Sequence, residues 1–356
     1  MKVAKECFDL KEIYRFPFTS SDNPNTVIEP TTRCNLKCPG CYRRTNLDAE
    51  REMTVPEMKE YIDKVAKARN SSCISFLGGE PLLHKQVGEA ITYAKEQGFN
   101  VGLYSNGLLL TIEKLRELKE LGVSYILIHV DKHQKRGITE DEINQIRDDF
   151  CNMFREVGGV QLGFVFQLME SDKNDIPTMV EYFTKNADIV RVAAFVACTN
   201  STPKDAARPA IRRSIAEVKL CKAVKDAYGL EWSSYLGSRL DENLPGKIMS
   251  LSAYRDGKLL YAVDPKSYGA KLRQAREETG RFPYIDNLPW PYASSAPEEN
   301  IDWHYIVFNF TPFLKSDGLN ICDSCTDAVL HEGHYVPMCI LEDLRAEHIA
   351  LEQVLG

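Results

Sequence analysis

Cys34, Cys38 and Cys41 stand in one short Cys-x3-Cys-x2-Cys segment, where three thiols can bind metal together. Three thiolates do not complete a tetrahedral site for a single ion. They can bind three irons of a 4Fe-4S cluster and leave the fourth iron open to another molecule. The alternatives are a structural zinc site, which needs a fourth ligand, and three unrelated core thiols. The spacing therefore favours an iron-sulfur site with one open iron.

Two further motifs follow short apolar runs that predict buried strands. Gly78-Gly79-Glu80-Pro81 comes after the run over 73–77, and Ser105-Asn106-Gly107 comes after the run over 100–104. A glycine pair lets the backbone approach a ligand closely, and a carboxylate beside it can receive an ammonium group. Asn-Gly alone is most often only a turn. The order and spacing of the motifs, taken together with the cysteines, make them informative.

In this order, the cysteine loop with an aromatic residue after Cys41, the Gly-Gly-Glu-Pro motif and the Ser-Asn-Gly motif resemble the signature of the radical S-adenosylmethionine (SAM) enzymes. The resemblance implies that the amino and carboxylate groups of SAM chelate the open iron of a 4Fe-4S cluster on Cys34, Cys38 and Cys41. An electron from the cluster then cleaves SAM to methionine and a 5'-deoxyadenosyl radical. A flavodoxin- or ferredoxin-type protein is the expected electron donor. The residues expected to bind the cofactor are Tyr42, Gly78, Gly79, Glu80, Pro81, Ser105, Asn106, Asp131 and Gln167.

Apolar runs and helical stretches alternate along the chain and predict six strands between about residues 27 and 198. This alternation is typical of a parallel sheet covered by helices, an α/β fold. The resembled fold is a six-stranded partial (β/α) TIM-like barrel, with its reacting groups at the carboxyl ends of the strands. Four regions are expected: an N-terminal extension over 1–24, the barrel over 25–200, a helical and aromatic substrate-associated segment over 201–319, and a smaller C-terminal auxiliary-cluster domain over 320–356.

A second set of cysteines, Cys322, Cys325 and Cys339, lies near the carboxyl end. A Cys-x2-Cys pair with a distant third cysteine resembles the auxiliary-cluster motifs of the twitch and SPASM extensions found in radical SAM enzymes. The resemblance implies a second 4Fe-4S cluster, while a zinc site and a redox-active or unligated pair remain alternatives. The fourth iron is either open to the substrate or capped by one of six candidates: Cys198, Cys221, Asp323, Asp327, His331 and His334.

Composition narrows the class of protein. The net charge of the 356 residues is -7, which gives no general signal for nucleic-acid binding. No apolar stretch approaches the roughly 20 residues that span a bilayer, and the first ten residues lack the apolar core of a secretory signal. A cytoplasmic location is therefore expected. In that compartment, 11 cysteines favour metal or thiol chemistry over disulfides.

The predicted function is hydrogen abstraction from a small-molecule substrate held at the barrel mouth. If the second cluster accepts an electron from the substrate radical, the outcome is oxidation or rearrangement. If the thiol of Cys198, the candidate catalytic residue at the end of the sixth strand, returns a hydrogen atom, the outcome is epimerisation. Maturation of a ribosomal peptide is the alternative within the same family. A non-catalytic iron-sulfur or zinc scaffold is the alternative of another class.

Overall fold

The computed structural model describes residues 9–43, 50–172, 174–197, 232–241, 243–284, 301–309, 313–315, 318–347 and 349–355. Its centre is a set of six strands, each hydrogen-bonded in parallel to the next in sequence order. They are β2 (Asn25–Ile28), β3 (Cys73–Phe76), β4 (Asn100–Ser105), β5 (Val123–His129), β6 (Gln161–Leu168) and β7 (Val190–Ala197). The predicted α/β class and the six-stranded partial barrel are confirmed.

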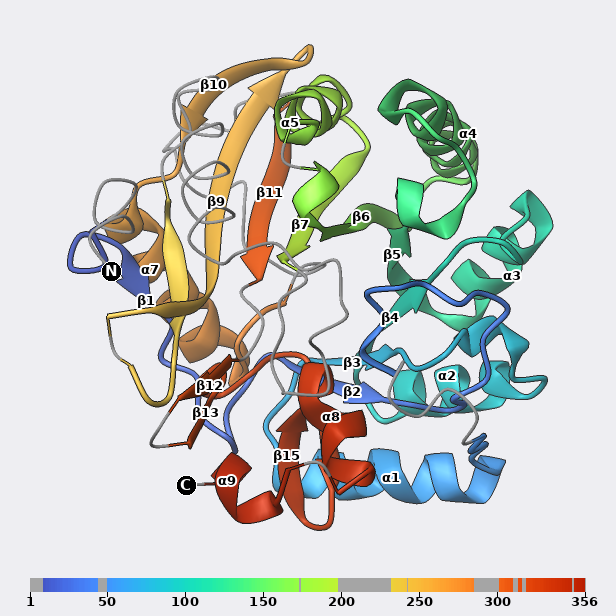
Figure 1. The fold of residues 1–356 in the computed structure, drawn as a ribbon, viewed down its shortest axis with the longest axis vertical. Helices are drawn as coiled ribbons and strands as arrows, with labels where there is room; N and C mark the ends of the chain where they lie inside the picture. The colour runs from blue at the N-terminus through green and yellow to red at the C-terminus, as the bar shows by residue number, and fades with distance from the viewer. Residues whose placement is uncertain are drawn as a thin grey trace.

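Helices cover the outer face of these strands (Figure 1). They are α1 (Val55–Ala68), α2 (Val87–Glu96), α3 (Ile112–Leu121), α4 (Glu140–Val157) and α5 (Ile176–Lys185). Their limits follow from local chemistry. Thr54 and Glu57 form a reciprocal capping box at the start of α1, and Gly122 ends α3 with a φ of 102°. Short 3-10 helices follow three strands: η3 (Pro81–Leu83), η4 (Lys132–Gln134) and η5 (Glu170–Asp172).

The sheet continues beyond both edges of the barrel. At the β7 edge, β11 (Asp302–Asn309) pairs in parallel with β7, and β9 (Pro245–Arg255) pairs antiparallel with β11. The remaining strands on this side are β8 (Ser234–Gly237), β10 (Lys258–Ala262) and β1 (Tyr14–Arg15). At the other edge, β14 (Ala328–His331) pairs in parallel with β2, and β15 (His334–Pro337) pairs with β14. Each of the two outer strands of the barrel, β2 and β7, therefore pairs with a further strand over at least part of its length.

The described part of the region after β7 is built mainly of strands. Sequence reasoning expected a helical and aromatic segment there, and its predicted helix over 211–228 lies outside the described residues. One helix, α7 (Pro265–Thr279), packs beside β1 and β8. Near the carboxyl end, a hairpin of β12 (Phe313–Lys315) and β13 (Gly318–Asn320) precedes α8 (Met338–Arg345) and α9 (Leu351–Leu355). None of the described helices combines the length and apolarity needed to cross a membrane.

Candidate active site with two cysteine loops

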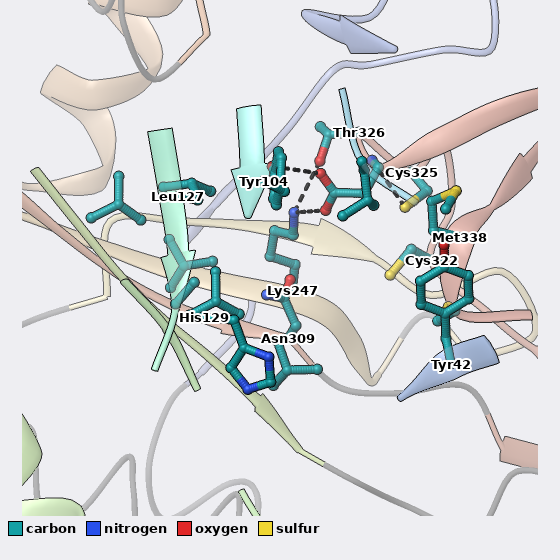
Figure 2. A pocket seen from close by; sticks show the side chains of 18 of the residues that line it. Tyr42, Tyr104, Leu127, His129, Lys247, Asn309, Cys322, Cys325, Thr326 and Met338 are labelled. Carbon is teal, nitrogen blue, oxygen red and sulfur yellow. Dashed lines mark hydrogen bonds and ion pairs between the residues drawn. The ribbon is translucent and has the colours of Figure 1, made fainter. Parts of the chain in front are cut away.

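A cavity of about 360 Å³ opens among residues from the carboxyl ends of the barrel strands. Asn106 follows β4, His129 ends β5, and Gln167 lies near the end of β6. The cavity is lined by both sets of cysteines: Cys34, Cys38, Cys41, Cys322, Cys325 and Cys339. Figure 2 shows Cys322 and Cys325 beside Tyr42 and Met338, with His129 and Asn309 further along the same cavity. The fold thus brings together two loops that lie almost 300 residues apart in the sequence.

The first cysteine loop rests directly on the barrel, and glycines make the contact possible. A Cβ atom at Gly79 would lie 2.0 Å from the carbonyl oxygen of Arg33, and one at Gly40 would lie 2.3 Å from Oε1 of Gln167. Nε2 of Gln167 donates a hydrogen bond to the Gly40 carbonyl, and the Gly79 amide donates to Thr31 O at 2.9 Å. Larger residues at these glycines would push the loop off the barrel. These contacts hold the loop against the barrel, so that Cys34, Cys38 and Cys41 line the cavity, where a metal cluster can bind.

The thiols of this loop are suited to metal rather than to free thiolate chemistry. Burial raises the pKa of Cys38 to about 12 and that of Cys41 to about 11. Metal binding must therefore displace protons from these thiols. Among the described residues, no group of three or more Cys, His, Asp or Glu side chains converges on a single ion. An iron-sulfur cluster does not require such convergence, because each cysteine binds a different iron.

Glu80 braces two strand ends instead of facing the cavity. Its buried carboxylate accepts hydrogen bonds from Ser105 Oγ at 2.9 Å, the Asn106 amide at 2.8 Å and the Leu82 amide at 3.1 Å. Burial raises its pKa, although these three donors oppose the shift. Gly78, Gly79, Ser105 and Asn106 line the cavity, whereas Glu80 and Pro81 are absent from its described lining. The expected cofactor residues are thus divided between those that line the cavity and those that hold them in place.

Asp131 likewise positions a cavity-lining residue, His129, to which it is hydrogen-bonded. Burial works to raise its pKa, but hydrogen bonds and the positive field of His129 and His133 outweigh burial and hold the pKa at about 2. The ionised carboxylate therefore accepts a hydrogen bond from Nε2 of His129. His129 lines the cavity, and Asp131 does not. Sequence reasoning selected Asp131 and missed His129, although residues two apart on a strand share a face and could have revealed it.

Tyr42 lies between the two cysteine loops. Its hydroxyl donates to Glu29 Oε1 at 2.7 Å, and burial raises the pKa of the phenol well above its ordinary value. Its ring lines the cavity and packs against the hydrophobic cluster formed by the C-terminal segment. The aromatic residue that follows the first loop thus contacts the part of the molecule that carries the second loop.

The second cysteine loop makes an equally close approach to a glycine. A Cβ atom at Gly246, on β9, would lie 2.5 Å from the sulfur of Cys322. Cys325 precedes β14, and Cys339 lies in the first turn of α8. Burial raises the pKa of Cys339, and the hydrogen bond with Cys322, together with burial, raises that of Cys325. Both thiols are therefore protonated at neutral pH until a metal displaces the proton.

Of the candidate fourth ligands in the described residues, only Asp327 lines the cavity. Its Oδ2 accepts an ion-paired hydrogen bond at 2.8 Å from Lys247, a buried residue of β9 that the sequence reasoning missed. Asp323 instead pairs with Arg15 at the surface, at 3.1 Å. His331 and His334 lie on β14 and β15. Cys198 and Cys221 lie outside the described residues, so the catalytic role predicted for Cys198 stays a prediction.

The remainder of the cavity wall is largely apolar and aromatic. Many of the aromatic residues after position 231 are buried core residues, and a few of these also reach the cavity. Besides Tyr42, the cavity-lining tyrosines are Tyr104, Tyr268, Tyr284 and Tyr305. Aliphatic side chains from β5, β6, β7 and β11 complete the wall: Leu127, Val165, Val192 and Val307. Within the described residues, Lys247 at the wall is ion-paired with Asp327, and His129 is hydrogen-bonded to Asp131.

These features define an α/β partial barrel with a cysteine loop at the mouth of its strands. A family model described as the radical SAM superfamily matches residues 28–159. That part of the chain, which supplies the first cysteine loop and strands β3 to β5, is a radical SAM domain.

Known proteins resemble the chain over part of its length. Fe-coproporphyrin III synthase of Methanosarcina barkeri is 31% identical over 170 residues, which cover 46% of this chain and 42% of that protein. PqqA peptide cyclase of Bradyrhizobium diazoefficiens is 33% identical over 103 residues, which cover 29% of this chain and 27% of that protein. The crystal structure of Streptococcus suis SuiB bound to its precursor peptide SuiA superposes with a TM-score of 0.47 and 14% identity, over 59% of this chain and 48% of that one. The chain thus spans less than half the length of each of these relatives.

Proposed function

We propose that this chain is a radical SAM enzyme that abstracts hydrogen from a carbon of a small-molecule substrate, with a second 4Fe-4S cluster assisting at Cys322, Cys325 and Cys339. The observation that supports the proposal most directly is that both sets of cysteines line one cavity. A substrate in that cavity would lie between the two metal sites. The second site can then act on the same substrate molecule as the first.

Cys34, Cys38 and Cys41 would hold the first cluster, and the cavity-lining backbone at Gly78 and Gly79 lies beside them for SAM. When bound, the cluster and SAM supply a 5'-deoxyadenosyl radical that takes a hydrogen atom from the substrate. The chain's own contribution is to hold these groups against the barrel and to exclude water. The apolar wall formed by Leu127, Val165 and Val192 serves the second purpose.

His129 is placed to accept a proton from the substrate. Because the ionised Asp131 carboxylate accepts the Nε2 proton of His129, the lone pair of the ring lies on Nδ1 whenever the ring carries one proton. Nδ1 has no hydrogen-bond partner among the described residues, and the ring lines the cavity. A substrate hydroxyl or amine beside the reacting carbon can transfer its proton to Nδ1, and its electron pair stays on the substrate. The Asp131 carboxylate then stabilises the resulting imidazolium.

A peptide substrate is the second candidate, and the 33% identity to a peptide cyclase over 103 residues favours keeping it. The cavity of about 360 Å³ would then receive one side chain of the peptide instead of a whole molecule. The two candidates share the metal sites and differ in what lies at the cavity mouth. A scaffold without catalysis is the alternative of another class.

Anaerobic reconstitution tests the proposal. The wild type, a Cys34→Ala/Cys38→Ala/Cys41→Ala variant and a Cys322→Ala/Cys325→Ala/Cys339→Ala variant are loaded with iron and sulfide, and 5'-deoxyadenosine is assayed after SAM and dithionite are added. We expect about eight irons in the wild type and about four in each variant. Deoxyadenosine should form from the wild type and not from the first variant.

Cys151→Ala is the matched control, because Cys151 is a thiol on the buried face of α4 that belongs to neither loop. It should keep the iron content and the deoxyadenosine of the wild type. About four irons with turnover in the wild type would remove the second cluster from the proposal. A fully loaded wild type that never cleaves SAM would favour the scaffold.

A further inference from the structure

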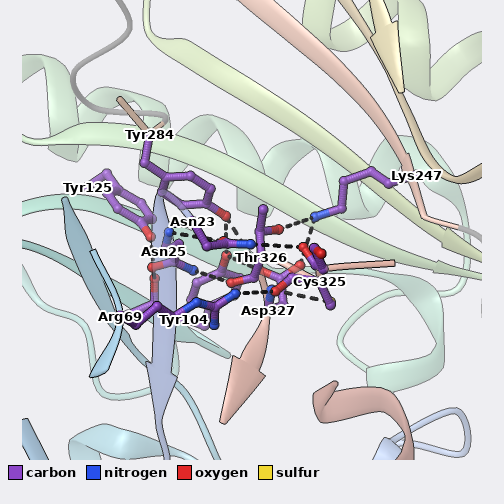
Figure 3. A network of polar contacts seen from close by, with 12 residues as sticks. Asn23, Asn25, Arg69, Tyr104, Tyr125, Lys247, Tyr284, Cys325, Thr326 and Asp327 are labelled. Atoms are coloured by element: carbon purple, nitrogen blue, oxygen red, sulfur yellow. Dashed lines mark hydrogen bonds and ion pairs between the residues drawn. The ribbon is translucent and has the colours of Figure 1, made fainter. Parts of the chain in front are cut away.

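Three buried side chains of the barrel hold the second cysteine loop from behind (Figure 3). Nδ2 of Asn23 donates to Ser324 O at 2.9 Å, Nη2 of Arg69 donates to Cys325 O at 3.0 Å, and Nδ2 of Asn25 donates to Thr326 O at 3.0 Å. The exposed fractions of Asn23, Arg69 and Asn25 are 0%, 2% and 0%. Three successive carbonyls of the loop thus receive hydrogen bonds from donors that water does not reach. We call these three donors the carbonyl clamp.

The clamp is itself fixed by neighbouring residues. Oδ1 of Asn25 accepts from Ser75 Oγ at 2.7 Å, which sets the orientation of the amide so that Nδ2 faces the loop. The guanidinium of Arg69 lies over the ring of Tyr335, 4.3 Å from its centre. Burying an arginine and two amides costs free energy unless their hydrogen bonds are made. A loop with no defined geometry could not satisfy donors in such fixed positions.

The clamp also determines where the loop's amide hydrogens point. A trans peptide unit is planar, and its N–H points away from its C=O. Thr326 O and the Asp327 amide belong to one peptide unit, so the bond from Asn25 to Thr326 O turns the Asp327 N–H to the opposite side. On that side the Asp327 amide donates to the sulfur of Cys325 at 3.4 Å. Asn25 therefore directs an N–H group at a sulfur that it does not touch.

We propose that the carbonyl clamp positions the second metal site, and that Asn25 in particular raises the reduction potential of its cluster by keeping the Asp327 N–H directed at Cys325. Hydrogen bonds to cluster sulfurs stabilise the reduced, more negative state. The inference rests on the proposed function, since it requires a cluster on Cys322, Cys325 and Cys339. Asn23, Asn25 and Arg69 are positioning residues in this proposal and do not touch the cluster.

The test is a redox titration of the reconstituted full chain, followed by electron paramagnetic resonance. The signal that changes when SAM is added identifies the first cluster, and the other signal identifies the second. In Asn25→Leu, which keeps the branched shape of the side chain and has no donor, the ratio of reduced to oxidised second cluster at a fixed potential should fall about tenfold, the effect of losing one hydrogen bond to a charged group. The first cluster should keep its potential.

Asn186→Leu is the control, because Asn186 also donates its amide to a backbone carbonyl, Tyr182 O at 3.0 Å, at the end of α5. It should leave both potentials unchanged. If the Asn25→Leu protein does not load its first cluster, Asn25→Ser is measured in its place. The same shift in the potential of the second cluster is expected. If Asn25→Ser also fails to load it, Asn23→Leu is measured instead and should shift the second potential in the same direction.

The outcomes separate the inference from the function on which it rests. A second cluster in the wild type whose potential does not move in the clamp variants would overturn the inference and leave the proposed function intact. A wild type without any second cluster would overturn both. If Asn25→Leu loses the iron of the second cluster and keeps the first cluster, the clamp is required for the second cluster to bind at all, which would support the inference that it positions this site.

Discussion

His304 is a buried histidine that the structure keeps neutral. Its Nδ1 donates to Val190 O at 2.6 Å, and its Nε2 has no hydrogen-bond partner among the described residues. Burial lowers the pKa of this ring to about 4, against an ordinary value of about 6.5. The centre of this ring, on β11, lies 5.9 Å from the centre of the Tyr254 ring on β9. This residue therefore makes the folded state sensitive to acid.

The sign of the effect follows from the two pKa values. Below about pH 6.5 the unfolded chain binds a proton at His304, whereas the folded chain does not until about pH 4. The free energy of unfolding thus falls from pH 7 to pH 5 by about 2 kcal/mol on account of this group. In His304→Asn, which keeps a donor towards Val190 O, that part of the loss should disappear. Urea unfolding of both proteins at pH 7 and pH 5 measures it, and an equal loss in the two proteins would refute the assignment.

Gly246 provides a second prediction at the scale of one residue. Its absent side chain is what allows Cys322 to lie against β9, since a Cβ would lie 2.5 Å from the sulfur and 3.0 Å from Cα of Cys322. Gly246→Ala should displace Cys322, so that the iron content falls from about eight to about four atoms per chain while SAM cleavage persists. The control is Gly88→Ala in α2, where a Cβ would meet only a methyl group of Leu121, at 3.1 Å. Unchanged iron in Gly246→Ala would contradict this reading.

The sequence predicted the six cysteines because their spacing is local within each loop. It did not reveal Lys247, because the partner that explains its burial, Asp327, lies 80 residues away. Gly246 was hidden for the same reason, since only the folded molecule places Cys322 against it. Glu80 was assigned to SAM from its neighbours in the sequence, and this assignment stays a prediction; only the folded molecule shows that its carboxylate accepts hydrogen bonds from Ser105, Asn106 and Leu82.

At the scale of elements, one tyrosine joins the C-terminal hairpin to the barrel. The hydroxyl of Tyr61, on α1, donates to Val27 O of β2 at 2.6 Å and accepts from the Leu330 amide of β14 at 2.7 Å. Strands β2 and β14 share a single register pair, Val329 with Val27. The two hydrogen bonds of this hydroxyl therefore add to the single register pair that joins the hairpin to the barrel. We expect the attachment of the hairpin to depend strongly on them.

Tyr61→Phe removes both hydrogen bonds and leaves a buried carbonyl and amide without this partner. We expect the free energy that protects the β14–β15 hairpin from opening to fall by about 2 kcal/mol. Hydrogen exchange of residues 328–337 should then accelerate by about one to two orders of magnitude. Exchange in β4 and β5 serves as the internal control and should not change. Equal acceleration throughout the barrel would indicate global destabilisation instead.

The barrel elements were predictable because each strand is a short apolar run and each helix has a local start or stop signal, such as Thr54 or Gly122. Strands β8 to β11 were not predicted. Their pairing partners are distant in sequence: β9 lies against β11, and β11 joins β7 across more than 100 residues. Tyr254 and Trp303 are buried where these strands pack, and Tyr305 is buried and also lines the cavity.

At the scale of the whole molecule, the extensions at the two barrel edges converge on one cavity. β9 brings Lys247 and Gly246 from one edge, and the segment that leads into β14 brings Cys322 and Cys325 from the other. The ion pair between Lys247 and Asp327 joins the two extensions directly. Lys247→Met should therefore weaken the closure of the sheet around the cavity as well as remove a charge beside the second loop.

We expect Lys247→Met to leave Asp327 as a largely buried carboxylate without its cation and to lower the free energy of unfolding by about 3 kcal/mol. Thermal unfolding measures this change. Lys247→Met/Asp327→Leu should recover much of the loss, because both charges are then absent, and a double variant no more stable than the single one would show that the pair is not the cause.

The pairing of β14 with β2 also sets an order of events in time. Val329 is synthesised about 300 residues after Val27, so the barrel strands and the first cysteine loop leave the ribosome long before the second loop exists. Closing so long a stretch of chain is slow compared with pairing neighbouring strands. The first cysteine loop therefore leaves the ribosome before the C-terminal segment that packs beside it exists, whereas the second loop emerges when all six barrel strands have already been synthesised.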